Sequence, residues 1–165
     1  MGSPVVTKPR LRQAVRALVV DDDDHVLLVH FRWEGLALPD GFWACPGGGI
    51  EPDEDAEAAL RRELVEELGL VDPDVRGPVW RLTRMMTMAD FDGQTDVTYL
   101  VRAPRFVPRP QVDLAAENVH GLRWFSPQEV AAGEVAFSPR DLAVHLARVL
   151  ADGVPERPRE IAALA

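Results

Sequence analysis

The segment from Glu51 to Glu67 combines a dense negative charge with the spacing of an α-helix. It holds eight acidic residues and two arginines, whereas the whole chain of 165 residues has 27 acidic and 18 basic residues. Leu60, Leu64 and Leu68 recur at every fourth position, so on a helix they form one apolar face. The sequence therefore predicts a helix that buries its leucines against another element and carries acidic groups beside them.

Three glutamates of this helix are expected to share one side of it. Glu63, Glu66 and Glu67 stand at positions i, i+3 and i+4, which places them within an arc of about 100°. Like charges at this spacing repel one another. A divalent cation would remove the conflict, and carboxylate oxygens select Mg²⁺ or Mn²⁺. A solvated acidic face is the alternative, and the spacing alone does not decide between the two.

A glycine-rich loop leads directly into this helix. Gly47, Gly48 and Gly49 follow Pro46, and they allow the backbone to approach a ligand or a metal closely. The loop is not a phosphate-binding P-loop, because no Gly-Lys-Ser or Gly-Lys-Thr follows it. We therefore expect the loop and the acidic helix to form one site.

Strand-like and helix-like segments alternate along the rest of the chain, which predicts a mixed α/β (α+β) fold. Ser126-Pro127-Gln128-Glu129 has the form of a capping box at a helix start. Ser138-Pro139 is expected to open a second helix, with Leu142, Leu146 and Val149 facing the core. We expect a loose leader over residues 1–10, one domain over 11–153 and a frayed tail over 154–165. Strands are predicted at 14–20, 26–31, 80–89, 94–103 and 120–125.

Composition excludes several classes of protein. The net charge of −9 argues against nonspecific binding of nucleic acid or of an anionic membrane. The single cysteine, Cys45, excludes an internal disulfide framework. No apolar run could cross a bilayer, and Arg10, Arg12 and Arg16 interrupt any signal-peptide core, so we expect a cytoplasmic protein, and a homodimer is compatible with the sequence. The four aspartates at 21–24 are expected to form a solvated hairpin tip, because consecutive side chains cannot all converge on one ion.

The loop and the helix together resemble the complete Nudix box. Gly48 is followed after five residues by Glu54, and after seven more by Arg62-Glu63-Leu64-Val65-Glu66-Glu67-Leu68-Gly69-Leu70. Nine specified residues at fixed spacing over 23 positions leave little room for chance agreement. The resemblance covers about a seventh of the chain and implies the α/β/α sandwich of the Nudix hydrolases, with a mixed β-sheet.

The resemblance also implies an activity. Nudix enzymes hydrolyse a nucleoside diphosphate linked to another moiety by attack of water at phosphorus, with Mg²⁺ or Mn²⁺ as cofactor. The other moiety can make the substrate a nucleotide, ADP-ribose, a nucleotide sugar or a dinucleotide. By the same resemblance Glu63, Glu66 and Glu67 bind the metal, with the backbone carbonyl of Gly47 as a further ligand. Arg62 and Glu54 are expected to orient the loop and the helix.

The general base is left open between two places. In some family members it is a glutamate of the box, and in others it is a glutamate on a later loop. Glu117, ahead of the strand at 120–125, stands in a matching position and would then also contact the metal. Among the box residues, Glu66, Glu63 and Arg62 are the expected catalytic groups, and His120 is a weaker rival for the base.

Residues outside the box should select the substrate. Arg32 and Arg84 are candidates to bind phosphate. The candidates to frame a base or a ribose are Phe31, Trp33, Phe42, Phe91 and Asn118. For the four aromatic side chains among them, core packing is the alternative role. The sequence Met85-Met86-Thr87-Met88 stands where ADP-ribose hydrolases place a proline and dinucleoside polyphosphate hydrolases a tyrosine, so the substrate is not readable from these markers.

Two other functions compete with a hydrolase of small nucleotides. A noncatalytic Nudix-fold module that senses a nucleotide is the first, although such a module has no need of the box carboxylates that this chain keeps. The isomerase branch of the family is the second, but it requires a catalytic cysteine, and Cys45 precedes the glycine loop and is expected to pack in the interior.

Overall fold

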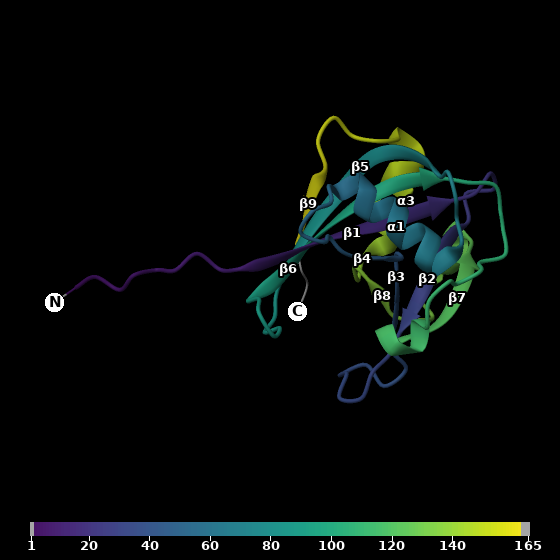
Figure 1. Cartoon of the computed structure of the whole chain (residues 1–165). Coiled ribbons are helices and arrows are strands. Elements are labelled where there is room, and N and C mark those ends of the chain that lie inside the picture. The colour runs from purple at the N-terminus through teal and green to yellow at the C-terminus, as the bar shows by residue number, and fades with distance from the viewer. Residues whose placement is uncertain (1, 163–165) are drawn as a thin grey trace.

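Nine strands form one mixed β-sheet in residues 2–162, the part of the chain that the computed structural model describes (Figure 1). The strands are β1 (Leu11–Val20), β2 (Val26–Phe31), β3 (Phe42–Ala44), β4 (Gly47–Gly49), β5 (Asp74–Met85), β6 (Gly93–Arg102), β7 (Val119–Phe125), β8 (Phe137–Ser138) and β9 (Arg159–Ile161). The helices are α1 (Ala56–Leu68), α2 (Pro127–Ala132) and α3 (Leu142–Asp152), with a 3₁₀ turn, η1, at Leu114–Glu117.

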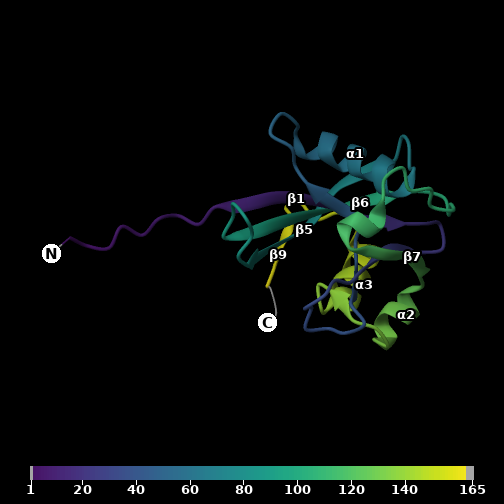
Figure 2. The ribbon, with the colours of Figure 1, turned by 60° about the horizontal axis from the view of Figure 1, so that its bottom comes forward.

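The sheet has helices on both of its faces. Its order is β8-β3-β2-β1-β6-β5-β9, with β4 paired to β1 and β7 paired to β2. β1 and β6 run parallel, while β1 and β2 run antiparallel. Figure 2 shows α1 on one side of the sheet and α2 and α3 on the other. The predicted mixed α/β sandwich is therefore confirmed.

The alternation of side chains along β1 builds the two halves of the core. Val15, Ala17 and Val19 pack with the leucines of α1, whereas Leu18 and Val20 pack with the apolar face of α3. Side chains of a strand point alternately to its two faces, so a central strand must be apolar on both to be covered by helices on both. The predicted core residues are confirmed as buried: Leu60, Leu64, Leu68, Leu142, Leu146 and Val149.

Local capping fixes where α1 begins and ends. The side chain of Asp55 accepts a hydrogen bond from the backbone N–H of Ala58 at 2.8 Å. Gly69 follows the last turn with a φ of 66°, in the left-handed region that favours glycine, and its N–H donates to the carbonyl of Val65. Aspartate and glycine are residue types that favour these two positions, and the caps set the length of helix that carries the box glutamates.

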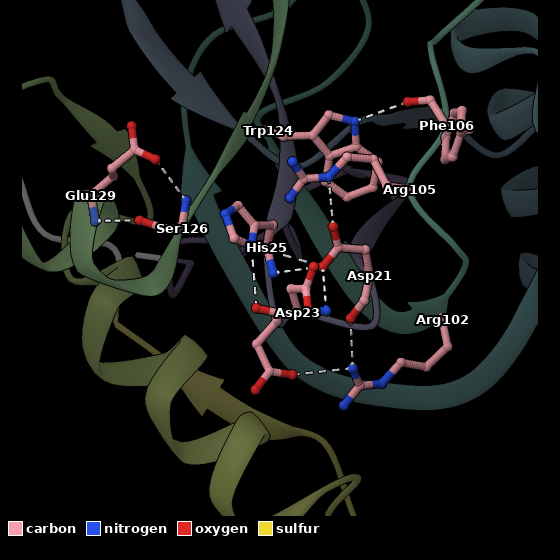
Figure 3. Close-up of polar contacts among 10 residues, drawn as sticks. Asp21, Asp23, His25, Arg102, Arg105, Phe106, Trp124, Ser126 and Glu129 are labelled. Atoms are coloured by element: carbon pink, nitrogen blue, oxygen red, sulfur yellow. Dashed lines mark hydrogen bonds and ion pairs between the residues drawn. The ribbon is translucent and has the colours of Figure 1, made fainter.

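The second and third helices differ in how well their starts are predicted. At α2 the capping box is confirmed, since Ser126 Oγ accepts from the N–H of Glu129 and the Glu129 carboxylate accepts from the N–H of Ser126 (Figure 3). The prediction that Ser138-Pro139 opens α3 is wrong. Ser138 instead lies in β8, which pairs with β3, and α3 begins only at Leu142.

Strand β5 begins six residues before the predicted start at residue 80 and ends at Met85 rather than at residue 89. Gly77 and Pro78 suggest a break in the sequence, but the ladder to β6 passes them through two register shifts. A bulge leaves a residue unpaired, so glycine and proline are tolerated there. The connection to β6 is correspondingly longer than the gap between the predicted strands at 80–89 and 94–103, because β5 ends at Met85 and β6 begins at Gly93.

The two ends of the chain differ from each other. Residues 2–10 form no helix or strand and extend away from the sheet (Figure 1). We expected residues 154–165 to fray, but β9 pairs in parallel with β5, and Ile161 is buried in the core. Residue 1 of the expected leader and residues 163–165 of the expected tail lie outside the described residues. None of the helices within 2–162 is long and apolar enough to span a membrane.

The aspartate tip between β1 and β2 is only partly solvated. Asp22 and Asp23 are exposed as predicted, but Asp21 is buried. Its Oδ1 accepts from the N–H groups of Asp23 and His25, each at 2.9 Å, and its Oδ2 accepts from Arg105 at 2.8 Å (Figure 3). Burial alone would raise the pKa of Asp21, but these hydrogen bonds outweigh it and hold the pKa below its ordinary value. Asp21 therefore joins the hairpin to the segment after β6.

Asp21→Asn is expected to lower the free energy of unfolding by about 1 to 2 kcal/mol at neutral pH, because it removes the charge from three hydrogen bonds. Since the folded pKa lies below the unfolded one, this stabilisation is full above the ordinary aspartate pKa of 3.8 and is lost as the pH falls through and below it. Urea denaturation over a pH series measures both effects. Asp22→Asn is the matched control, and equal stability of the two variants at pH 7 would contradict the assignment.

Candidate functional site

The guanidinium group of Arg62 lies at the centre of the loop–helix segment. Its Nη2 donates to the carbonyl of Gly49 at 3.0 Å and to Glu54 at 2.5 Å, and its Nε donates to the other oxygen of Glu54 at 3.1 Å. Its Nη1 donates to Glu63 at 2.9 Å and to Glu66 at 3.3 Å. The hydrogen bond to Glu54 is the largest contribution that raises the pKa of Arg62. Arg62 thus joins the glycine loop, the turn before α1 and two box glutamates.

Glu67 is the most buried of the box carboxylates. It is 2% exposed, and its Oε2 accepts from the N–H of Gly47 at 3.3 Å. Burial, followed by the negative charge of Glu63, raises the pKa of Glu67 to about 8. The negative charge of Glu67 is destabilised, because the carboxylate is buried, has one long hydrogen bond and lies beside another carboxylate. Either a bound proton or a bound cation would remove this destabilisation.

Close approach to the backbone of β1 requires glycine at position 47, and the Glu63 side chain lies against position 48. Gly47 has a φ of 149°, and a Cβ there would lie 2.0 Å from the carbonyl oxygen of Val15 in β1. A Cβ on Gly48 would lie 2.4 Å from Oε1 of Glu63. β4 is therefore held between β1 and α1 at a distance that only glycine permits, and the Glu63 carboxylate rests against the bare backbone.

Glu117 belongs to the same cluster of charges. It ends η1, just ahead of β7, and is exposed. The partial burial of its carboxylate is the largest cause that raises its pKa, and the negative charges of Glu63 and Glu66 raise it further. His120 lies farther along and has its Nε2 3.0 Å from the carbonyl oxygen of Arg32. Of these two candidates for the base, Glu117 is therefore the one on which the negative charges of the box glutamates act.

The oxygen atoms of the box glutamates and of the Gly47 carbonyl are suitable ligands for a divalent cation, although they do not point to one common position. Among residues 2–162 no three His, Cys, Asp or Glu side chains meet closely enough to hold a metal ion as they stand. Arg62 Nη1 instead contacts Glu63 and Glu66. All the candidate donors are oxygens, and the cradle between Glu63 and Gly48 leaves no room for a Cβ. These are the hard ligands and the close backbone approach that Mg²⁺ or Mn²⁺ needs.

A pocket of about 210 Å³ lies on the α3 side of the sheet, beside the glycine loop. Its apolar wall includes Phe31, Trp33 and Phe42, of which Phe31 and Phe42 are stacked at 5.5 Å between ring centroids. Its polar lining includes Arg16, which donates to the Gly47 carbonyl at 3.4 Å. The pocket and the carboxylate cluster are therefore neighbours across β1 and β4. The remaining lining residues are Arg12, Ala44, Cys45, Trp80, Leu82, Arg84, Met86, Met88, Gln94, Asp96, Thr98, Ser138 and Pro139.

The NUDIX domain profile matches residues 10–146 of the chain. The chain belongs to the NUDIX family. It is 33% identical to the nucleoside triphosphatase NudI of Salmonella heidelberg strain SL476 over 135 residues, which cover 79% of this chain and 93% of that protein. It is 27% identical to Nudix hydrolase 25 of Arabidopsis thaliana over 146 residues, which cover 78% of this chain and 80% of that protein. It is a Nudix hydrolase in sequence as well as in the order of its elements.

Solved structures give the same fold. The NUDIX domain of Shewanella oneidensis NrtR, crystallised with ADP ribose, aligns with a TM-score of 0.64 at 23% identity, over 90% of this chain and 94% of that one. A NUDIX hydrolase from Nitrosomonas europaea aligns with a TM-score of 0.65 at 16% identity, over 94% of this chain and 81% of that one. At these identities the likeness concerns the fold alone.

In this Nudix hydrolase the predicted substrate residues are divided between different places. Phe31, Trp33, Phe42 and Arg84 line the pocket, and Arg84 also donates to Ser138. Arg32 instead lines a shallower depression with His120, and its N–H donates to the carbonyl of Asn118. Phe91 lies under the guanidinium of Arg10, 5.7 Å from it, and does not line the pocket. Neither Phe91 nor Asn118 lines this pocket, and contact of either residue with a base or ribose stays a prediction.

Sequence reasoning missed Arg16 and Asp96. Arg16 Nε donates to Asp96 at 3.3 Å, and its guanidinium lies 5.7 Å from the centre of the Phe31 ring. From the sequence alone, Arg16 serves only as one of the charges that interrupt a signal-peptide core. Its even position in β1 was the available signal, because Leu18 and Val20 share that face and are buried under α3.

Cys45 is buried and packs in the core cluster under α3. Burial raises the pKa of its thiol to about 12. Such a thiol stays protonated at neutral pH and is a poor nucleophile. This position agrees with the interpretation of Cys45 as a packing residue.

The metal-free protein is expected to lose stability as the pH rises from about 4.5 to about 8. Over this range Glu67 is ionised in the unfolded chain and protonated in the folded one, because its pKa is raised from 4.5 to about 8. The stabilisation is full below the unfolded pKa and is lost as the pH rises through the folded pKa. Urea denaturation with a chelator present measures the slope. Glu67→Gln should flatten the slope, and the exposed Glu57→Gln should not; an unchanged slope in Glu67→Gln would contradict this assignment.

Proposed function

We propose that this Nudix hydrolase cleaves the diphosphate bond of a nucleoside diphosphate linked to another moiety, with Mg²⁺ or Mn²⁺ as cofactor. One observation carries the proposal: Arg62, Glu54, Glu63 and Glu66 form a single network beside the buried Glu67. The network adjoins a pocket with aromatic and arginine side chains. The name of a relative that is 33% identical, a nucleoside triphosphatase, supports a nucleotide-type substrate.

The cation would be held by Glu63, Glu66 and Glu67, with the Gly47 carbonyl as a further ligand. When bound, it neutralises charge on the diphosphate and makes a bound water easier to deprotonate. Glu117, whose pKa is raised by partial burial and then by the charges of Glu63 and Glu66, is a further candidate to hold the cation.

The protein's own groups position the reaction. Arg62 fixes the carboxylates of Glu63 and Glu66 relative to the loop through its bonds to Glu54 and the Gly49 carbonyl. Orientation of reacting groups lowers the barrier because it removes freedom before the reaction begins. Glu117 then accepts the proton of the attacking water, with a glutamate of the box as the alternative base.

The substrate spans the pocket and the carboxylate cluster. The nucleoside packs against the aromatic wall that Phe31, Phe42 and Trp33 form together, and Arg84 and Arg16 face its phosphates. Arg32, which lies in the separate depression next to His120, binds the moiety on the far side of the cleaved bond, and Asn118 supports the Arg32 backbone. This division follows from the positions of the arginines, since a guanidinium binds phosphate oxygens in pairs.

Glu66→Gln is expected to lower kcat by about two orders of magnitude or more, because it removes a charge at the metal. The substitution should leave the melting temperature without metal nearly unchanged, since this side chain is one-third exposed. Mass spectrometry of the products measures hydrolysis with Mg²⁺ and a panel of nucleoside triphosphates, ADP-ribose, nucleotide sugars and dinucleoside polyphosphates. Glu57→Gln, on the exposed face of α1, is the matched control.

Two results would count against this proposal. Near-full turnover by Glu66→Gln would show that this box glutamate is not needed for the reaction. Absence of hydrolysis across the panel, with nucleotide binding intact, would favour the noncatalytic nucleotide sensor.

Glu117→Gln is expected to flatten the acidic limb of the pH–rate profile, because a base with a raised pKa must lose its proton before it acts. The profile of kcat/KM from pH 5 to pH 9 measures the change. His120→Gln is the control and should keep the limb. A profile unchanged by Glu117→Gln would return the role of base to the box.

The cytoplasmic location, the absence of nucleic-acid and membrane partners and the homodimer remain predictions.

A further inference from the structure

We propose that Asp96 is a specificity-determining residue that accepts a hydrogen bond from the amino group of a nucleobase. This inference rests on the proposed function and names the part of the substrate that the pocket selects. The bases concerned are those with an exocyclic amino group, namely cytosine, adenine and guanine, as opposed to uracil, thymine and hypoxanthine.

The register of three strands places Asp96 in the floor of the pocket. In the row nearest the open end of the sheet, Arg12 of β1, Gln94 of β6 and Arg84 of β5 stand side by side. In the row nearest the core, Thr98 stands beside Arg16. Asp96 occupies the row between them, and Leu100, on the same face, begins the buried core. Even-numbered residues of β6 all point to this face, so Asp96 faces the cavity.

Asp96 is held from one side only. Its Oδ1 accepts from Gln94 Nε2 at 2.8 Å and from Arg16 Nε at 3.3 Å. The Gln94 amide is fixed in turn, because its Oε1 accepts from Arg12 at 3.0 Å. Oδ2 takes part in no hydrogen bond formed among residues 2–162. A carboxylate that is 15% exposed and has one such oxygen presents an acceptor to whatever enters the pocket.

The rest of the pocket fits a flat ring. Phe31 and Phe42 are stacked on each other, and Trp33 meets Phe42 edge to face at 5.7 Å between centroids. A volume of about 210 Å³ is smaller than the roughly 300 to 1,000 Å³ of pockets that enclose a drug-sized ligand. It has room for one nucleobase with part of its sugar, and a second nucleoside must lie outside.

The charges around Asp96 set which edge of the base it meets. Arg12, Arg16 and Arg84 donate hydrogen bonds only, so they suit the carbonyl and phosphate oxygens of a nucleotide. Asp96 is the one acidic residue among those that line the pocket. A base with an amino group beside a ring nitrogen or a carbonyl satisfies both kinds of partner. A base with a carbonyl in place of the amino group would leave Oδ2 facing another oxygen.

Matched pairs of nucleotides test this inference. CMP and UMP, and AMP and IMP, differ by an amino group in place of a carbonyl, and GMP and IMP differ by an amino group in place of hydrogen. Equilibrium binding is measured by calorimetry, which does not need turnover. We expect the wild type to bind the amino-bearing member of at least one pair about tenfold more tightly or better. Equal affinities in all three pairs, or no binding at millimolar concentration, would overturn the inference.

Asp96→Asn sharpens the test. Its Oδ1 would keep the bonds from Arg16 and Gln94, so the amide nitrogen would face the pocket as a donor. The CMP:UMP or AMP:IMP preference should then fall to one or invert, and the GMP:IMP preference should fall to one. General damage to the pocket would instead weaken both members of a pair equally and leave the ratio unchanged, which would overturn the role of Asp96. Asp74→Asn, an exposed aspartate paired with Arg76, is the matched control and should keep the wild-type ratio.

Hydrolysis separates this inference from the proposed function. A binding preference without hydrolysis of the corresponding triphosphates would support Asp96 and contradict the hydrolase proposal for those substrates. Hydrolysis that depends on Glu66, with equal kcat/KM and equal affinity for the two members of every pair, would support the hydrolase proposal. The same result would contradict the role of Asp96. Asp96→Glu is the second variant if Asp96→Asn fails to fold, and it too should change the ratio, because its carboxylate extends farther into the pocket.

Discussion

The contacts of Arg62 hold the functional segment in one arrangement. A single guanidinium group bonds to the loop at Gly49, to Glu54 before the helix and to Glu63 and Glu66 on the helix. Without it the hydrogen bond from the Gly47 N–H to Glu67 would remain as a polar link between the loop and α1, and Glu63 and Glu66 would repel each other without a compensating charge. One positive charge cannot neutralise all of these carboxylates. The segment therefore keeps an excess of negative charge, which the proposed divalent cation would neutralise.

The pocket beside this acidic cluster is basic, so positive and negative charge lie on neighbouring parts of the molecule. The chain as a whole carries a net charge of −9, yet arginines outnumber acids in the pocket. Arg16 links the two regions, because it contacts Asp96 on one side and the Gly47 carbonyl on the other. Its charge also opposes the rise in the pKa of Glu67. A ligand with a neutral ring and a charged phosphate chain suits such a boundary.

The parts of the fold that follow from local spacing could be predicted from the sequence. The helix α1, its caps at Asp55 and Gly69 and its buried leucines depend on residues within a few positions of each other. The Nudix box is defined by fixed spacings between its residues, and it lies within the residues that the family profile matches. These features are readable because helix geometry converts sequence distance into spatial distance directly.

The parts that depend on long-range pairing could not be predicted. β9 is a three-residue strand whose partner, β5, lies far away in the sequence, so no local pattern announces it. The burial of Asp21 depends on Arg105, from the segment after β6. The pocket depends most of all on register, since Arg16 and Asp96 meet only because β1 and β6 run parallel. A shift of one residue would turn Asp96 to the opposite face.

We propose that the Arg62 network and its carboxylates form the cation site. Anomalous diffraction from crystals of the wild type grown with Mn²⁺ would locate that cation. We expect a manganese peak within bonding distance of carboxylate oxygens of Glu63, Glu66 and Glu67. A peak at the aspartates of the β1–β2 turn, or no peak at these glutamates at saturating Mn²⁺, would contradict it.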